Sequence, residues 1–172
     1  MMGDAVDRAV LNPEARRTMT DEKVRVATVL EQELDATIER WMKRVMEVPE
    51  LTRISLSYDD RTAHLPRLIQ DLIVRLRLKP KAVAPTSTSA DDHGKVRFQQ
   101  GYSVPMLVEE SRLLQVSIFD TLRRAQKLLD PSILMLDVVT IADECDAQLK
   151  HTVETFMDLE KRGKRGAIQK AS

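Results

Sequence analysis

Residues 90–122 read ADDHGKVRFQQGYSVPMLVEESRLLQVSIFDTL and join a polar helical segment to a long amphipathic one. In the first segment His93 and Arg97 lie four residues apart, which places them on one face of a helix. Gly101 interrupts that helix, and Ser103 has the chemistry to cap the helix that follows. The stretch therefore predicts two helices that meet at a backbone break surrounded by polar side chains.

Apolar residues recur at spacings of three and four on both sides of this stretch, which is typical of amphipathic helices. We expect helices over about 20–47, 59–79, 103–129 and 132–162. Only 3% of the residues are aromatic and five are glycine, a composition that favours helices over strands. The prediction is an all-α helical bundle of five to six helices with a long C-terminal helix, and a globin-like arrangement is one form it could take.

The chain has 172 residues, enough for one domain with a full hydrophobic core. We expect an N-terminal arm or docking helix over 1–19 and a single helical domain over 20–162. Residues 163–172 contain two glycines and several basic residues but no acidic residue, so we expect a disordered basic tail.

The overall composition excludes several classes of partner. The 27 basic and 27 acidic residues cancel, so no net field attracts nucleic acid or an anionic membrane. A single cysteine, Cys145, cannot form an internal disulfide and favours a reducing compartment. No apolar run approaches the roughly 18 residues that span a bilayer. We therefore expect a cytoplasmic protein that binds neither nucleic acid nor membrane.

The last helix is longer than a compact bundle of this size requires, which favours pairing with a second copy. Its apolar stripe approximates a heptad pattern over a few repeats. We therefore predict a homodimer through the C-terminal helix. The stripe consists of Val138, Ala142, Cys145, Leu149, Val153 and Phe156.

The sequence contains no nucleophile motif, no glycine-rich phosphate loop and no metal-ligand spacing. Cys145 and His151 are six residues apart, on different faces of a helix. We therefore expect a protein that is not an enzyme and has no cofactor or metal site. His64 and His93 could flank a haem, and His93 could accept a phosphoryl group, but neither has a sequence context that favours such a role.

One group of polar residues around the break remains as a candidate site. It could bind a ligand, since His93 and Arg97 together could grip an anion, or His93 could respond to pH. Alternatively it is a structural clasp, in which Glu110 pairs with Arg97 or Arg112 and Tyr102 covers the break. The sequence leaves both alternatives open. The candidate residues are His93, Arg97, Gln100, Tyr102, Glu110 and Arg112.

Part of this stretch has the form H-G-x-x-R-x-x-Q-G-Y-x₇-E-x-R-L-L, from His93 to Leu114. It resembles the N-terminal domain of the RsbRD-type RsbT co-antagonists, which also occurs as an input domain of bacterial sensor histidine kinases. Trp41 and the segment HLPRLIQDLIVRL over 64–76 resemble the same family, so the likeness covers about residues 25–130. Ser111 departs from it, since a larger residue is expected between the Glu and the Arg.

The resemblance implies a non-enzymatic, all-helical signal-transduction input domain that is usually followed by an output domain. In stress-response proteins the output is a STAS domain, and in kinases it is a dimerising helical and ATP-binding pair. We therefore expect a sensor domain that passes a signal along its last helix to an output domain or a downstream signalling protein. The alternative is a globin-like haem-binding or small-molecule-binding protein.

Overall fold

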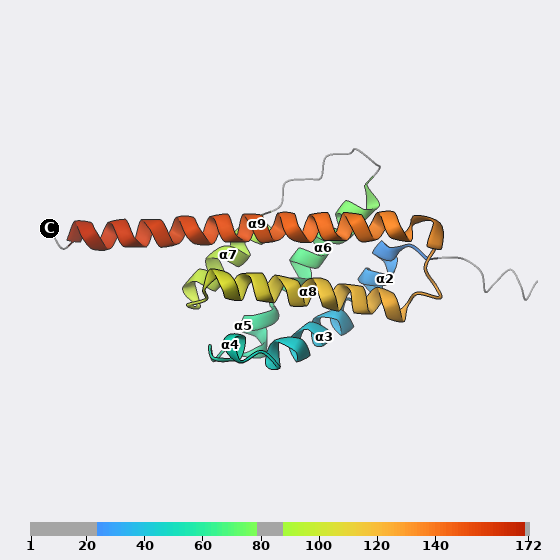
Figure 1. Ribbon diagram of the computed structural model, residues 1–172, viewed down its shortest axis with the longest axis horizontal. Helices are drawn as coiled ribbons and strands as arrows, with labels where there is room; N and C mark the ends of the chain where they lie inside the picture. Colours follow the sequence, from blue (N-terminus) through green and yellow to red (C-terminus); the bar gives the residue numbers. More distant parts are fainter. Residues whose placement is uncertain (1–23, 79–87, 171–172) are drawn as a thin grey trace, which may run out of the picture.

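Helices make up most of the part of the chain that the computed structural model describes, residues 24–78 and 88–170. Val24 and Leu129 form an isolated parallel bridge, and no strand occurs in the described ranges. The prediction of an all-α helical bundle is confirmed, whereas the arm expected over 1–19 lies outside the described residues. The helices, labelled as in Figure 1, are α2 (Val26–Gln32), α3 (Leu34–Met46), α4 (Pro49–Thr52), α5 (Tyr58–Thr62), α6 (Leu65–Arg77), α7 (Ser89–Gln99), α8 (Val104–Arg124) and α9 (Pro131–Lys170).

Two long helices, α8 and α9, run antiparallel and side by side (Figure 1). The turn between them is closed by Asp130, whose carboxylate accepts a hydrogen bond of 2.9 Å from the Ser132 amide. We expected α9 to end at Arg162, but it continues to Lys170. The glycines of the tail lower helix propensity by only about 1 kcal/mol each, too little to end a helix of this length.

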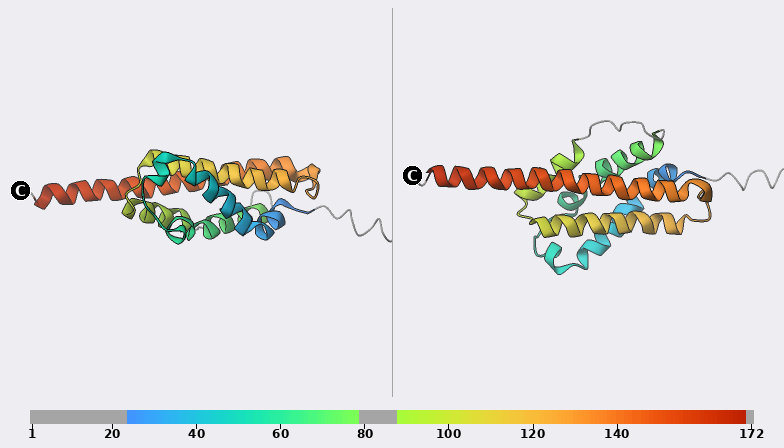
Figure 2. Two further views of the ribbon diagram at one scale, coloured as in Figure 1. Left: turned by 90° about the horizontal axis from the view of Figure 1, so that it is seen from below. Right: turned by 45° about the horizontal axis from the view of Figure 1, so that its top comes forward.

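The remaining helices lie on two sides of this pair. Helices α6 and α7 pack on α9, α2 packs on α6 and α8, and α3 and α4 pack on α8 (Figures 1 and 2). Trp41 of α3, Leu72 of α6 and Ile118 of α8 are among the side chains buried in the shared core. None of the helices in 24–78 and 88–170 has an apolar run of the length needed to cross a bilayer.

Two of the expected helices are each divided in two. The helix expected over 20–47 is interrupted at Glu33, between α2 and α3, and its expected start lies outside the described residues. The helix expected over 59–79 is interrupted between α5 and α6, where Pro66 lies in the first turn of α6. Proline lacks an amide N–H and clashes with the carbonyl four residues earlier, so it forces this second break. The apolar stripe continues across the first break, from Leu30 to Leu34 and Ile38, so periodicity alone does not reveal that break.

The apolar stripe of α9 faces the rest of the chain. Cys145 and Phe156 are buried, and Val153 packs against the same core. The stripe that we expected to form a dimer interface is therefore largely occupied by intramolecular contacts.

Helices α7 and α9 approach each other closely at Gly94. A Cβ atom at this position would lie 2.6 Å from the Thr152 carbonyl oxygen and 3.2 Å from the Thr155 Cβ atom. The same crossing is fixed by hydrogen bonds from the Thr152 hydroxyl to the Ala90 carbonyl, at 3.1 Å, and from the Thr155 hydroxyl to the Asp91 carboxylate, at 2.8 Å. Glycine at residue 94 thus allows α7 to lie directly on α9.

Replacing Gly94 by alanine is expected to lower the free energy of unfolding by about 1–3 kcal/mol, because the added methyl group meets a backbone atom that cannot move aside. Chemical denaturation of both proteins measures the difference. Gly163→Ala is the matched control, since no atom lies within 4 Å of its added Cβ. An equal response of the two variants would contradict the close approach of α7 and α9.

Candidate functional site

The end of α7 sets the position of two site residues. Gly101 has a φ of 78°, in the left-handed region that glycine adopts without strain. Its amide donates to the Phe98 carbonyl at 3.1 Å, and the Tyr102 amide donates to the Arg97 carbonyl at 3.0 Å. This pair of hydrogen bonds is the Schellman motif. It turns the chain sharply, so that Tyr102 and the start of α8 lie back against the last turn of α7.

A buried ion pair joins α7 to α8. Arg97 Nε donates to Glu110 Oε2 at 2.9 Å, and Arg97 Nη2 donates to Glu110 Oε1 at 2.7 Å. The side chains are 0% and 3% exposed, respectively. Burial raises the pKa of the Glu110 carboxyl, and the Arg97 guanidinium acts in the opposite direction. Such a pair holds its geometry because a buried charge without its partner is very unfavourable.

Arg97 uses its remaining N–H groups to bind α5 and its own helix. Nη1 donates to the Asp60 carbonyl at 3.2 Å and to Gln100 Oε1 at 2.6 Å, and Nη2 donates to the Arg61 carbonyl at 2.8 Å. Together with Glu110 these acceptors match the five N–H donors of a guanidinium group. Arg97 therefore connects α5, α7 and α8.

Tyr102 and Arg61 extend the network on the other side of Glu110. The Tyr102 hydroxyl donates to Glu110 Oε1 at 3.1 Å and accepts from Arg61 Nη1 at 3.3 Å. Burial and the neighbouring carboxylate raise the pKa of Tyr102 to about 12, so the hydroxyl keeps its proton. Arg61 Nη2 donates to the carbonyls of Leu51 and Ile54 and so holds α4 and the chain after it against α5.

Two histidines stack beside the ion pair. The rings of His64 and His93 have centroids 4.1 Å apart and are inclined by 17°. His93 Nε2 lies 3.5 Å from Glu110 Oε2, and His64 Nε2 lies 3.4 Å from Arg97 Nη2. Burial, and then the Arg97 charge, lower the pKa of His93 to about 3, and burial lowers the pKa of His64 well below its usual value. Both imidazoles are therefore neutral at pH 7.

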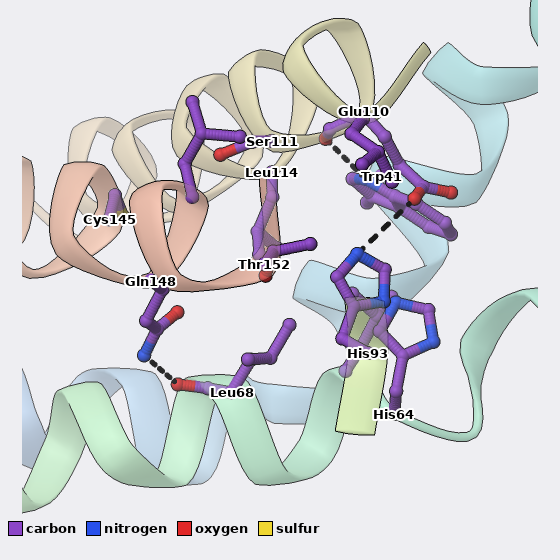
Figure 3. Close-up of a pocket in the computed structure, with 13 residues that line it drawn as sticks. Trp41, His64, Leu68, His93, Glu110, Ser111, Leu114, Cys145, Gln148 and Thr152 are labelled. Carbon is purple, nitrogen blue, oxygen red and sulfur yellow. Dashed lines mark hydrogen bonds and ion pairs between the residues drawn. The ribbon is translucent and has the colours of Figure 1, made fainter. Parts of the chain in front are cut away.

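A small cavity lies beside these rings, between α6, α8 and α9 (Figure 3). Its volume of about 30 Å³ is enough for roughly two water-sized occupants. Cys145 is part of the wall, and burial raises the pKa of its thiol to about 12. The Nδ1 atom of His93 is buried and has no hydrogen-bond partner. The apolar part of the wall is formed by Leu65, Leu68, Leu107, Leu114 and Leu149.

Five of the six predicted site residues come together: His93, Arg97, Gln100, Tyr102 and Glu110. The sixth does not join them, because Arg112 lies on the exposed side of α8 and pairs with Glu109 at 2.6 Å. Ser103 occupies the N-cap position of α8, but its hydroxyl does not cap the helix.

No pattern in the sequence predicted that His64 and Arg61 belong to the cluster. His64 is the N-cap residue of α6, at the break that Pro66 forces, and that proline is the available signal for its position. Arg61 is buried and donates to two backbone carbonyls and the Tyr102 hydroxyl. Acceptors of this kind leave no motif in the sequence that would identify Arg61.

The geometry bears on two roles considered for the histidines. A porphyrin cannot lie between His64 and His93 in this structure, because the two rings are already in contact with each other. Phosphorylation of His93 requires access to its imidazole, which is only 9% exposed. The arrangement therefore supports neither a haem between these histidines nor a phosphoacceptor at His93.

Comparison of the chain with protein-family models, curated proteins and solved structures finds no match. The resemblance to the RsbRD-type domain therefore rests on the residues quoted above.

Replacing Arg97 by alanine is expected to lower the free energy of unfolding by about 3–5 kcal/mol, because it leaves the Glu110 carboxylate buried without its partner. Arg97→Lys should also be destabilising, since an ammonium group has three donors and cannot form the two-pronged contact. Chemical denaturation measures both. Arg112→Ala, which removes an exposed pair, should leave stability unchanged. Equal stabilities of Arg97→Ala and Arg112→Ala would contradict the clasp.

The stability of the fold is expected to fall as the pH is lowered from about 6.5 towards 3. In this range the unfolded chain binds a proton at residue 93 that the native state excludes, so His93 contributes up to about 1.4 kcal/mol per pH unit. Denaturation in metal-free buffer at several pH values measures the slope. The slope should be smaller in His93→Gln, and an identical slope would show that His93 titrates normally.

Proposed function

We propose that this chain is a non-enzymatic bacterial signal-transduction input domain of the kind it resembles, the RsbRD-type N-terminal domain. One observation carries the proposal: α9 packs on the helix that bears His93 and Arg97, and then continues beyond the bundle (Figure 1). The clasp is the input, and the projecting end of α9 is the output to a downstream domain or signalling partner.

The contacts provide a direct mechanical path from the clasp to α9. Arg97 fixes α7 to α8 through Glu110, and Gly94 fixes the same helix to α9 at Thr152. Helix α7 is therefore held between the two long helices. A ligand that changes the pairing of Arg97 moves α7, and the position of α9 follows.

A switch requires two arrangements of similar free energy. The clasp supports this requirement because acceptors surround Arg97 on several sides, including Glu110, Gln100 and the carbonyls of α5. When Arg97 loses one acceptor, others remain within its reach. A second arrangement of its hydrogen bonds therefore costs less free energy than leaving the guanidinium buried without partners. The burial of the cluster supports a binding role rather than turnover of a substrate.

Partner binding is part of the same proposal. Val139 and Met157 are exposed and lie 18 residues apart, which is five helical turns, so they share one face of α9. Met135 is exposed one turn before Val139. This face, rather than the stripe through Cys145, is the one we propose for a homodimer. The balanced charge of the chain and its single cysteine support a cytoplasmic protein that does not bind nucleic acid.

A fusion protein tests the proposal. The chain is joined through α9, after Gly166, to the catalytic part of a histidine kinase, and autophosphorylation is measured. Tyr102→Phe removes one hydrogen bond to Glu110 and should change the activity about fivefold or more, the usual range of allosteric coupling.

Tyr58→Phe is the matched control, because it removes an exposed hydrogen bond to Glu39 and should leave the activity unchanged. Equal activities of the parent fusion and Tyr102→Phe, with both folded by circular dichroism, would contradict a relay through α9.

A further inference from the structure

Two imidazoles and one carboxylate converge beside the cavity from three different helices. His64 lies at the start of α6, His93 lies on α7 and Glu110 lies on α8. One possible ligand atom from each residue lies within 4.8 Å of the other two. We propose that His64, His93 and Glu110 bind one divalent first-row transition-metal ion, which rests on the function proposed above in that the ion is the ligand of the input domain.

The residue types match that class of ion. Imidazole nitrogen and carboxylate oxygen bind Zn²⁺ at about 2.0–2.2 Å, and the same set suits Fe²⁺ and Ni²⁺. Bonds of this length place neighbouring ligand atoms of a tetrahedral site about 3.4 Å apart. Glu110 Oε2 already lies 3.5 Å from His93 Nε2, and the stacked rings of His64 and His93 must rotate apart for a nitrogen of each to point at the same ion.

The surroundings of Glu110 are those of a metal-binding carboxylate. Oε1 accepts from both Arg97 and Tyr102, whereas Oε2 accepts only from Arg97. An ionised carboxylate oxygen has two acceptor positions, so Oε2 keeps one on the side of His93. Arg97 and Tyr102 fix the orientation of the carboxylate, as outer residues do for the ligands of metal sites.

The ring contacts of the two histidines are long, at 3.5 Å from His93 Nε2 to Glu110 and 3.4 Å from His64 Nε2 to Arg97. His93 Nδ1 has no hydrogen-bond partner although it is buried. The five N–H donors of Arg97 already have five oxygen acceptors, so the contact of Nη2 with His64 at 3.4 Å is a sixth and longer one. Three protein ligands leave a further coordination position, and the adjoining cavity has room for a water molecule in it.

Binding of the ion has a consequence for Arg97. A dication near the guanidinium repels it, so Arg97 should shift towards the carbonyls of Asp60 and Arg61, which it already contacts. The shift weakens the link between α7 and α8. The metal would thus change the pairing of Arg97 on which the proposed relay depends.

Isothermal titration of the EDTA-treated chain with Zn²⁺ tests the site, with Co²⁺ absorption as a second readout and Mn²⁺ as the weaker-binding comparison. One ion per chain is expected. His64→Ala and His93→Ala should each weaken binding by about 100-fold or more. Loss of a residue that only supports a metal ligand already costs about 10–100-fold, and loss of the ligand itself should cost at least as much. His151→Ala is the matched control, because its side chain is exposed on α9 and contacts Glu154.

Absence of saturable binding by the folded parent chain would overturn the proposal, as would full binding by folded His64→Ala and His93→Ala. If those variants do not fold, the parent chain and His151→Ala decide: the proposal needs one ion per chain in both and a Co²⁺ spectrum with nitrogen ligation. Failure here leaves the fusion experiment untouched, since that experiment uses Tyr102→Phe and no metal. The two proposals can therefore fail separately.

Discussion

The fold depends on the ion pair between Arg97 and Glu110. Both charges are removed from water, so each must find all its partners within the protein. The partners come from the end of α5, the end of α7 and the start of α8, and the Trp41 indole donates to the Glu110 carbonyl at 3.2 Å. Five N–H donors and a carboxylate can be satisfied together in few arrangements of these helices. The pair therefore fixes their relative positions more strictly than apolar contacts would.

The sequence offered the pair as one alternative, since a structural clasp could have joined Glu110 to Arg97 or to Arg112, and two local features favour the first. Glu110 lies three residues after Leu107 and four before Leu114, in the middle of the apolar face of α8, where a charge must be paired. Arg97 lies just before the glycine that ends α7, so the chain brings the two residues together within a short loop. The all-α fold followed from periodicity in the same way.

Other parts of the site had no such signal. The acceptors of Arg61 are mainly backbone carbonyls, which every residue has, so its burial follows from the tertiary fold alone. His64 enters the cluster because a helix breaks before Pro66, and α5 on the other side of that break buries Arg61 and Thr62, which belong to no apolar stripe. The prediction that α9 ends at Arg162 was wrong. The residues around Gly163 and Gly166 continue the helix, and these two glycines do not end it.

The projection of α9 gives the molecule the geometry of a lever. Phe156 is the last buried side chain of this helix among those described, and the segment from Met157 to Lys170 spans about 21 Å. Gly94 and Thr152 lie close to the point where the helix leaves the bundle and so act as its fulcrum. A tilt of about 10° there would displace the far end by roughly 4 Å on this length. Sub-ångström adjustments at the crossing of α7 and α9 are thereby enlarged at the tip.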